Sequence, residues 1–179
     1  VRLLPPGSAG GPPLGPVLVV DVDGVLSDAS GRQHLLGGAE RQWAAFFEAS
    51  VDDPPIVEGI GLVRALADTG DGSSIDGVGV GVGVGVAGHP TVLLTARPSR
   101  LADTTMAWMG RHGIAWDLLV MRADDDHRSS PDVKREAVAD LRATGYEPVL
   151  AIEDDPRNAE MYRAEGVPVV YVHSGYYDL

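Results

Sequence analysis

The chain has 179 residues, 44% hydrophobic and 22% charged, which is typical of one globular domain with a core of its own. Its formal net charge of −12 excludes a broad basic surface, so we expect no extended nucleic-acid surface and only local contacts with a polynucleotide. Cysteine is absent, which excludes disulfides and thiolate chemistry and fits a cytoplasmic location, and no apolar run is long enough to span a membrane.

The first strand signal lies near the start of the chain. Residues 1–16 are interrupted by prolines and glycines, so we expect a flexible leader before a single domain at 17–179. The apolar run at 17–20 is typical of a strand buried on both faces of a parallel sheet. It leads into Asp21 and Asp23, which point the same way in an extended chain. Because open α/β sheets bind ligands beyond the carboxyl ends of their strands, both acids are candidates for chemistry; incidental acids in a solvated turn are the alternative.

The segment 27–55 predicts a loop, a short amphipathic helix and a second loop. Trp43, Phe46 and Phe47 fit one face of that helix. Packing in the core is the simpler interpretation of these aromatic residues, and a small flap over the site is the alternative.

The rest of the chain alternates between helices and strands. A helix is expected at 56–67, and a low-complexity insertion of alternating valine and glycine at 71–90, to which we assign no function. Further strands are expected at 91–95, 117–121, 148–152 and 168–172, and further helices at 100–112, at 130–143 and from 156 onward. Five strands alternating with helices predict an α/β fold with a parallel, doubly wound sheet.

Polar side chains that suit phosphate chemistry follow three of these strands and begin one helix. They are Asp21 and Asp23, Thr95 and Arg97, the consecutive acids Glu153, Asp154 and Asp155, and Lys134, the sole lysine of the chain. If the strands are neighbours, these groups converge into a carboxylate cluster fit for a hard cation. Acids directed at one crevice repel each other unless a cation or a shared proton holds them. Mg²⁺ prefers one or two carboxylates together with waters and phosphate oxygens, so the set favours phosphoryl transfer.

Each residue of such a site has a distinct expected role. Asp21 would be the nucleophile that forms an aspartyl-phosphate. Asp23 would be the general acid toward the leaving group and then the general base toward the hydrolytic water. Thr95 and Lys134 would hold the phosphoryl oxygens while charge redistributes.

These motifs, in this order, resemble the four signatures of the haloacid dehalogenase (HAD) superfamily of phosphotransferases. Residues 21–24 resemble the first signature, 93–95 the second, Lys134 the third and 153–155 the fourth. The resemblance implies a Rossmann-like five-stranded parallel sheet, with the strands, numbered along the chain, in the order 5-4-1-2-3. It also implies a phosphatase, because the second acid of the first signature is typical of the phosphatases of the superfamily.

The same resemblance suggests the metal ligands and the size of the cap. The expected Mg²⁺ ligands are Asp21, Asp23, Asp154 and Asp155. Among the three consecutive acids, Asp154 is favoured, and Glu153 and Asp155 are weaker candidates. The short segment between the first two signatures implies no large cap domain, which leaves the site open to a bulky substrate.

Several stretches are also similar to the phosphatase domain of phage-type polynucleotide kinase-phosphatases, which removes 3′-phosphates from nucleic-acid ends and nucleotides. They lie at 95–98, 120–122, 132–136 and 160–163, with Gly166. This likeness implies that Arg97 contacts phosphate or substrate, unless it only pairs with nearby acids. Arg32 and His34 could meet the substrate from the segment 27–55, although a turn histidine without a role is an equal alternative.

The sequence therefore predicts a Mg²⁺-dependent phosphomonoesterase that acts through an aspartyl-phosphate on a nucleotide or a nucleic-acid 3′-phosphate end. A phosphatase of a small phosphorylated metabolite is the first alternative. The second alternative, from another class, is a catalytically silent module that binds phosphate or a partner. Asp23 argues against the silent module, because a pure binder has no need of a second acid in the first signature.

Overall fold

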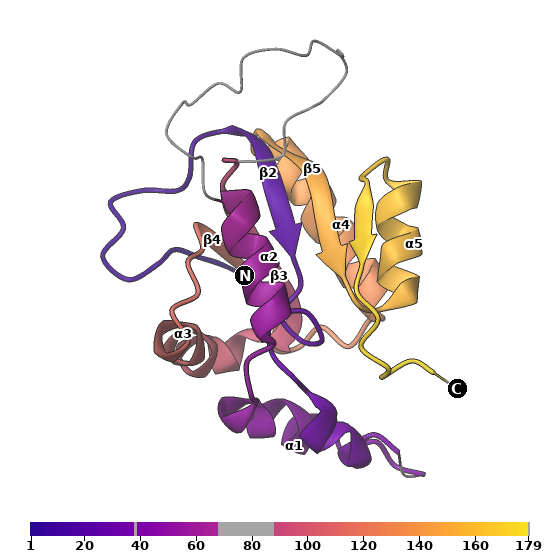
Figure 1. Cartoon of the computed structure of the whole chain (residues 1–179). Coiled ribbons are helices and arrows are strands. Elements are labelled where there is room, and N and C mark those ends of the chain that lie inside the picture. The colour runs from indigo at the N-terminus through magenta and orange to yellow at the C-terminus, as the bar shows by residue number, and fades with distance from the viewer. Residues whose placement is uncertain (38, 68–87, 179) are drawn as a thin grey trace.

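The computed structural model describes residues 1–37, 39–67 and 88–178 (Figure 1). Most of the expected valine-glycine insertion, 71–87, lies outside the described residues. A single six-stranded sheet has the strand order β1-β4-β3-β2-β5-β6. Its strands are β1 (Arg2–Leu3), β2 (Gly15–Val20), β3 (Thr91–Pro98), β4 (Leu118–Arg122), β5 (Tyr146–Glu153) and β6 (Val169–Tyr171). All neighbouring strands are parallel except β1 and β4, which are antiparallel.

The expectation of a five-stranded, wholly parallel sheet is wrong in the number of strands. The five parallel strands lie in the expected order, but β1 adds a sixth, antiparallel strand at the edge. It comes from the segment expected to be a flexible leader, where Arg2 pairs with Val120 and Leu3 with Leu119. Two residues are too few to show a strand period, so the pattern gave no sign of this pairing.

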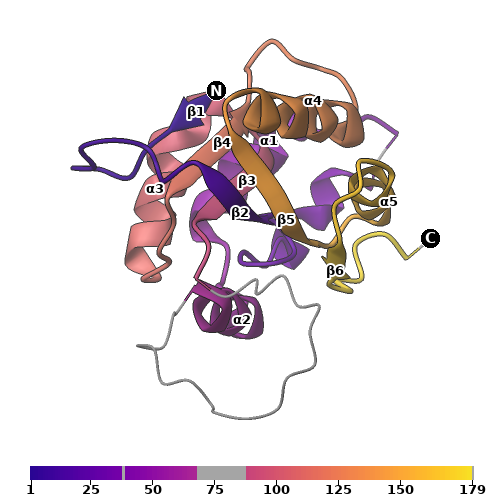
Figure 2. The ribbon, with the colours of Figure 1, turned by 90° about the horizontal axis from the view of Figure 1, so that it is seen from above.

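Helices cover both faces of the sheet (Figure 2). The helices of the described residues are α1 (Trp43–Glu48), α2 (Val57–Ala67), α3 (Ala102–Arg111), α4 (Ser130–Ala143) and α5 (Pro156–Ala164), with short 3₁₀-helices at Ser30–Leu35, Ala49–Asp52 and Ser99–Leu101. The helices α4 and α5 pack on one face, and α2 and α3 on the other. Within the described residues, no helix has both the length and the apolar character needed to cross a membrane.

Alternation along the strands builds two hydrophobic clusters, one on each side of the sheet. Val19 packs with Val138 and Leu141 of α4, whereas its neighbour Val20 packs on the opposite side with Trp108 of α3. Successive side chains of a strand point to opposite faces, so a continuous apolar run fills both clusters. This burial accounts for the uninterrupted valines and leucines of the central strands.

The described residues of the segment 27–55, here called the flap, lie between β2 and α2 in the chain. Its two ends are joined, since Asp28 N donates to Pro54 O at 2.8 Å and Ile56 N donates to Leu26 O at 2.7 Å. The strands β2 and β5 end on the side of the molecule where α1 of the flap lies (Figure 1). The flap therefore lies beside the carboxyl ends of the parallel strands, where the candidate site residues are found.

Candidate active site

A buried lysine between two carboxylates forms the centre of the site. Lys134 lies near the start of α4, and its Nζ is 2.7 Å from Oδ2 of Asp21 and 2.7 Å from Oε2 of Glu153. The lysine and Glu153 are fully buried. Burial opposes the charge of Lys134, but Asp21 and Glu153 outweigh burial and raise its pKa well above the usual value. The ammonium therefore stays charged and balances part of the negative charge around it.

Helix caps hold the elements that carry these residues. Ser129 caps α4 by accepting a hydrogen bond from Asp132 N, and a proline occupies the first turn, which fixes the place of Lys134. Asp155 caps α5 in the same way, accepting from Arg157 N at 2.9 Å. The expected helix starts at Ser130 and Pro156 are thus close to those observed.

An acidic cluster lies beside Lys134. Asp21, Glu153 and Asp154 each offer one carboxylate oxygen within 4.8 Å of the others. The Oδ2 atom of Asp154 is buried and makes no hydrogen bond. Burial and Asp21 raise the pKa of Asp154 to about 8, and burial and Glu153 raise the pKa of Asp21 well above its usual value. One lysine does not balance three buried acids, so the cluster has the electrostatic character of a cation site.

Gly24 makes the close packing of this cluster possible. It adopts a φ of +78°, and a Cβ atom at this position would lie only 1.8 Å from Oδ2 of Asp154. A glycine is therefore needed both for the backbone conformation and for the approach of the loop to the acid. Oxygen ligands, an unpaired buried carboxylate oxygen and surplus negative charge fit a hard divalent cation.

The variant Gly24→Ala is expected to weaken binding of a divalent cation, because the new methyl group displaces the Asp154 carboxylate. Changes around metal ligands typically reduce metal affinity by roughly 10–100-fold. Isothermal titration with Mg²⁺ measures the effect. Gly31→Ala is the matched control, since its Cβ would enter open space. Equal affinities of the two variants would contradict the role assigned to Gly24.

Asp23 faces a different environment from Asp21. Its Oδ1 atom is 2.5 Å from an Nη atom of Arg97 and 2.6 Å from an Nη atom of Arg32. Burial opposes ionisation, but Arg97 and then Arg32 outweigh it and lower the pKa of Asp23. The acidic cluster found among the described residues does not include Asp23. Asp21 and Asp23 thus lie in different electrostatic environments. Asp21 lies beside other acids, and Asp23 lies between two arginines.

Asp53 of the flap completes the arginine network. Its Oδ2 atom accepts hydrogen bonds from Arg32 at 2.7 Å and from Ser27 Oγ at 2.6 Å, and Arg97 lies 3.4 Å away. Its backbone carbonyl accepts a hydrogen bond from Trp108 Nε1 at 2.8 Å. Sequence reasoning missed this acid, because an aspartate before two prolines is typical of an ordinary turn.

Of the other residues expected in the site, some lie there and others do not. Thr95 is buried within β3, where its Oγ1 accepts a hydrogen bond from Arg97 N at 3.2 Å. His34 is exposed, and its Nδ1 lies 3.0 Å from the carbonyl oxygen of Gly31 in its own turn. Asp155 pairs with Arg157 at 2.7 Å. The structure therefore brings Thr95 and Arg97 to the end of the sheet but leaves the carboxylate of Asp155 outside the acidic cluster.

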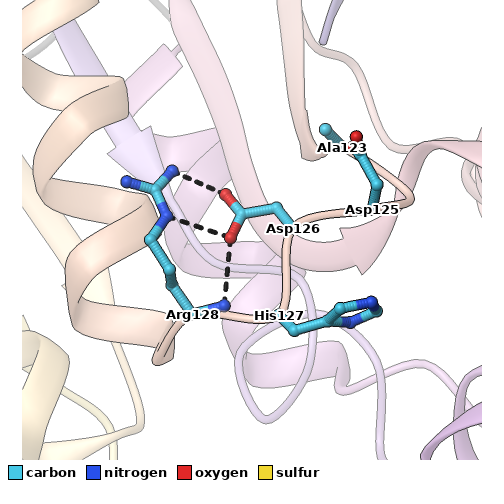
Figure 3. A pocket seen from close by; sticks show the side chains of 5 residues that line it. All are labelled: Ala123, Asp125, Asp126, His127 and Arg128. Atoms are coloured by element: carbon cyan, nitrogen blue, oxygen red, sulfur yellow. Dashed lines mark hydrogen bonds and ion pairs between the residues drawn. The ribbon is translucent and has the colours of Figure 1, made fainter.

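A cavity of about 560 Å³ lies in the loop between β4 and α4 (Figure 3). Its lining residues are Ala123, Asp125, Asp126, His127 and Arg128. Arg128 pairs with Asp126 at 2.6 Å, and the ring of His127 points away from this pair. None of the lining residues belongs to the acidic cluster, so we locate the active site by its side-chain chemistry and not by this cavity.

Comparison with known proteins identifies the family. The sequence model described as "Polynucleotide kinase PNKP phosphatase domain" matches residues 83–177, which is more than half of the chain. A search of curated proteins finds no match.

Solved structures share the fold. A chain of the Pnkp1/Rnl/Hen1 complex superposes with a TM-score of 0.64 at 21% identity, over 89% of this chain and 46% of that chain. A chain of the Pnkp1/Rnl/Hen1 RNA repair complex gives a TM-score of 0.64 at 19% identity, over 95% and 45%. The class C acid phosphatase from Bacillus anthracis with tungstate bound gives 0.55 at 12% identity, over 92% and 69%. The chain thus spans less than half the length of the first two. By the family match, the chain belongs to the family of the polynucleotide kinase PNKP phosphatase domain and is a HAD-type phosphatase.

Proposed function

We propose that the chain is a Mg²⁺-dependent phosphomonoesterase that acts through an aspartyl-phosphate on the 3′-phosphate end of a nucleic acid or nucleotide. The observation that carries this proposal is the Asp21 carboxylate, which Lys134 holds at 2.7 Å beside an acidic cluster with an unpaired carboxylate oxygen. We also propose a cytoplasmic location and a single domain that includes β1 as well as 17–179, with the flap as a minimal cap.

Asp21 is the proposed nucleophile. Lys134 contacts its Oδ2, and Val22 N donates a hydrogen bond to its Oδ1 at 2.7 Å, so both oxygens are oriented. In the first step a carboxylate oxygen bonds to phosphorus while the bond from phosphorus to the leaving oxygen breaks. Water then attacks phosphorus and releases phosphate and the free carboxylate. Thr95 and Lys134 are the proposed ligands of the phosphoryl oxygens.

The acidic cluster is the proposed Mg²⁺ site. Asp21 and Asp154 would hold the ion, and Glu153, which also pairs with Lys134, is the third candidate. A bound Mg²⁺ offsets the repulsion between the attacking carboxylate and the anionic phosphate. The cluster supports this set better than the expected set with Asp23 and Asp155, whose carboxylates pair with arginines.

Asp23 is the proposed acid and base. Arg97 and Arg32 lower its pKa and keep it ionised near neutral pH, which suits the removal of a proton from the hydrolytic water. For the first step Asp23 must carry a proton, a form favoured at acidic pH; it gives this proton to the leaving oxygen, and its carboxylate then takes a proton back from the attacking water. Because both arginines pair with Asp23, their geometry supports a role in positioning this acid more than a direct contact with the substrate.

A substrate panel tests the proposal. Phosphate release is measured with a 3′-phosphorylated oligonucleotide, its 5′-phosphorylated counterpart, mononucleotides and sugar phosphates, each with Mg²⁺ and with a chelator. We expect Mg²⁺-dependent release and the highest kcat/KM for the 3′-phosphorylated end. A higher kcat/KM for a sugar phosphate would favour the metabolite alternative. Absence of release from every substrate would reject the enzymatic proposal in favour of a silent binding module.

A further inference from the structure

The flap concentrates aromatic side chains in α1. Both phenylalanines of the chain and one of its three tryptophans lie within residues 43–47. The rings form one cluster: Trp43 stacks on Phe47 with centroids 5.8 Å apart and an interplanar angle of 25°. Phe46 meets Trp43 edge-on at 5.9 Å. The simpler sequence interpretation, packing in the core, fits Phe46, which is buried, but not the exposed Trp43, and neither of the two core clusters contains these rings.

Trp43 is the exposed member of this cluster. It is 46% exposed, whereas Phe46 is buried and Phe47 is half-buried. The guanidinium of Arg41 lies 6.0 Å from the centre of the Trp43 ring, within the range of a cation–π contact. The Trp43 ring thus offers a flat apolar surface. Phe47 stacks against this ring, and Arg41 places a positive charge near it.

A short series of contacts connects this surface to the catalytic centre. The guanidinium carbon of Arg32 lies 4.1 Å from the centre of the Phe46 ring. An Nη atom of the same arginine is 2.6 Å from Asp23. Phe46 and Arg32 therefore connect the exposed tryptophan to the proposed acid and base. Trp43 lies on the same flap that supplies Arg32 to the catalytic centre.

We propose that Trp43, accompanied by Arg41, stacks a nucleobase near the 3′ end of the substrate strand. This inference rests on the proposed function and adds a subsite to it. Every base has a π-face, so an aromatic platform binds single strands with little dependence on sequence. Stacking also suits a chain with a net charge of −12, because it does not need a basic surface. We therefore expect the KM for an oligonucleotide to depend only weakly on salt concentration.

The variant Trp43→Ala tests the subsite. We expect its KM for a 3′-phosphorylated oligonucleotide to rise by about tenfold, in line with the loss of one stacked base, with kcat unchanged. The kinetics with p-nitrophenyl phosphate, which has no nucleobase, should not change. Trp43→Phe should keep most of the affinity. Val57→Ala, which removes an exposed apolar side chain outside the flap, is the matched control and should alter neither substrate.

Binding measured without turnover separates this proposal from the proposed function. Fluorescence anisotropy with a 3′-hydroxyl oligonucleotide should show about tenfold weaker binding for Trp43→Ala, even if the wild-type chain releases no phosphate. Unchanged binding and unchanged KM would overturn the subsite while leaving the phosphatase proposal intact. An equal loss on p-nitrophenyl phosphate would also overturn it, since the effect would then act through Asp23. A change in sedimentation alone would instead assign the surface to contacts between copies of the chain.

Discussion

Asp21→Asn is expected to abolish phosphate release without destabilising the fold. The substitution removes the proposed nucleophile, and losses of about 10⁴-fold or more are typical when a nucleophile is replaced. The same side chain is buried, and burial and Glu153 raise its pKa, so its negative charge is disfavoured in the folded state. The neutral amide removes this charge, and Lys134 keeps its contact with Glu153 at 2.7 Å.

The sign of the pH dependence follows from the raised pKa of Asp21. The folded protein holds a proton on Asp21 at pH values where the unfolded chain has already lost it. Between the ordinary carboxyl pKa and the raised value, the stability of the wild-type protein therefore falls as pH rises. The Asp21→Asn variant lacks this contribution, so its advantage in free energy of unfolding should be larger near pH 8 than near pH 5.

Two measurements check this prediction. Phosphate release with Mg²⁺ reports activity, and urea unfolding with a chelator at the two pH values reports stability. Asp140→Asn, which neutralises an exposed acid on α4, is the control and should keep full activity. Release at the wild-type rate by Asp21→Asn would remove Asp21 from the mechanism, whereas lower stability near pH 8 would mean that its charge is well balanced.

The site residues that could be identified from the sequence share one property. Their positions follow from the strand or helix that carries them and from the parallel arrangement of the sheet. Asp21 follows the buried strand β2, Thr95 lies in the buried strand β3, and Lys134 follows a helix start with a serine cap and a proline. Parallel strands bring their carboxyl ends to one edge, so residues at these positions converge whatever the details of the loops. The fold class and the order of the parallel strands could be predicted for the same reason.

The residues that the sequence missed depend on contacts made only when the flap is folded. Asp53 is 21 residues from Arg32 and 44 from Arg97, and no local pattern relates them. The same contacts account for the separate environment of Asp23, which the sequence treated as a metal ligand beside Asp21. Conversely, His34 shares the turn of Arg32 but is exposed, so proximity in sequence was a poor guide within the flap.

The different environments of Asp21 and Asp23 suggest how the two acids take different chemical roles. Burial and neighbouring acids raise the pKa of Asp21, whereas Arg97 and Arg32 outweigh burial and lower the pKa of Asp23. Enzymes assign different roles to paired carboxyl groups by such differences of environment. Here the surplus negative charge around Asp21 favours a cation, and the arginines around Asp23 make a cation unnecessary there.

Lys134→Met is expected to cost both activity and stability, unlike Asp21→Asn. It leaves Asp21 and Glu153 buried without their shared cation, and breaking a buried ion pair typically costs about 3–5 kcal/mol of unfolding free energy. The loss should be larger near pH 8 than near pH 5, because the pKa of Asp21 is raised and more of this acid is protonated, and so neutral, at the lower pH. Urea unfolding with a chelator measures it.

A second substitution separates the two effects of Lys134. In the Lys134→Met background, Glu153→Gln removes one of the uncompensated acids and should restore much of the stability, but not phosphate release, since no ammonium remains for the phosphoryl oxygens. Arg135→Met is the matched control, because it removes the charge of the next residue on the same helix, where both ion-pair partners are partly exposed and the expected change is within about 0.5 kcal/mol. If Lys134→Met unfolded at the same urea concentration as Arg135→Met, the buried lysine would not be the charge that holds Asp21 and Glu153 together. If the double variant recovered phosphate release along with stability, Lys134 would act only in folding, and its place at the phosphoryl oxygens would be lost.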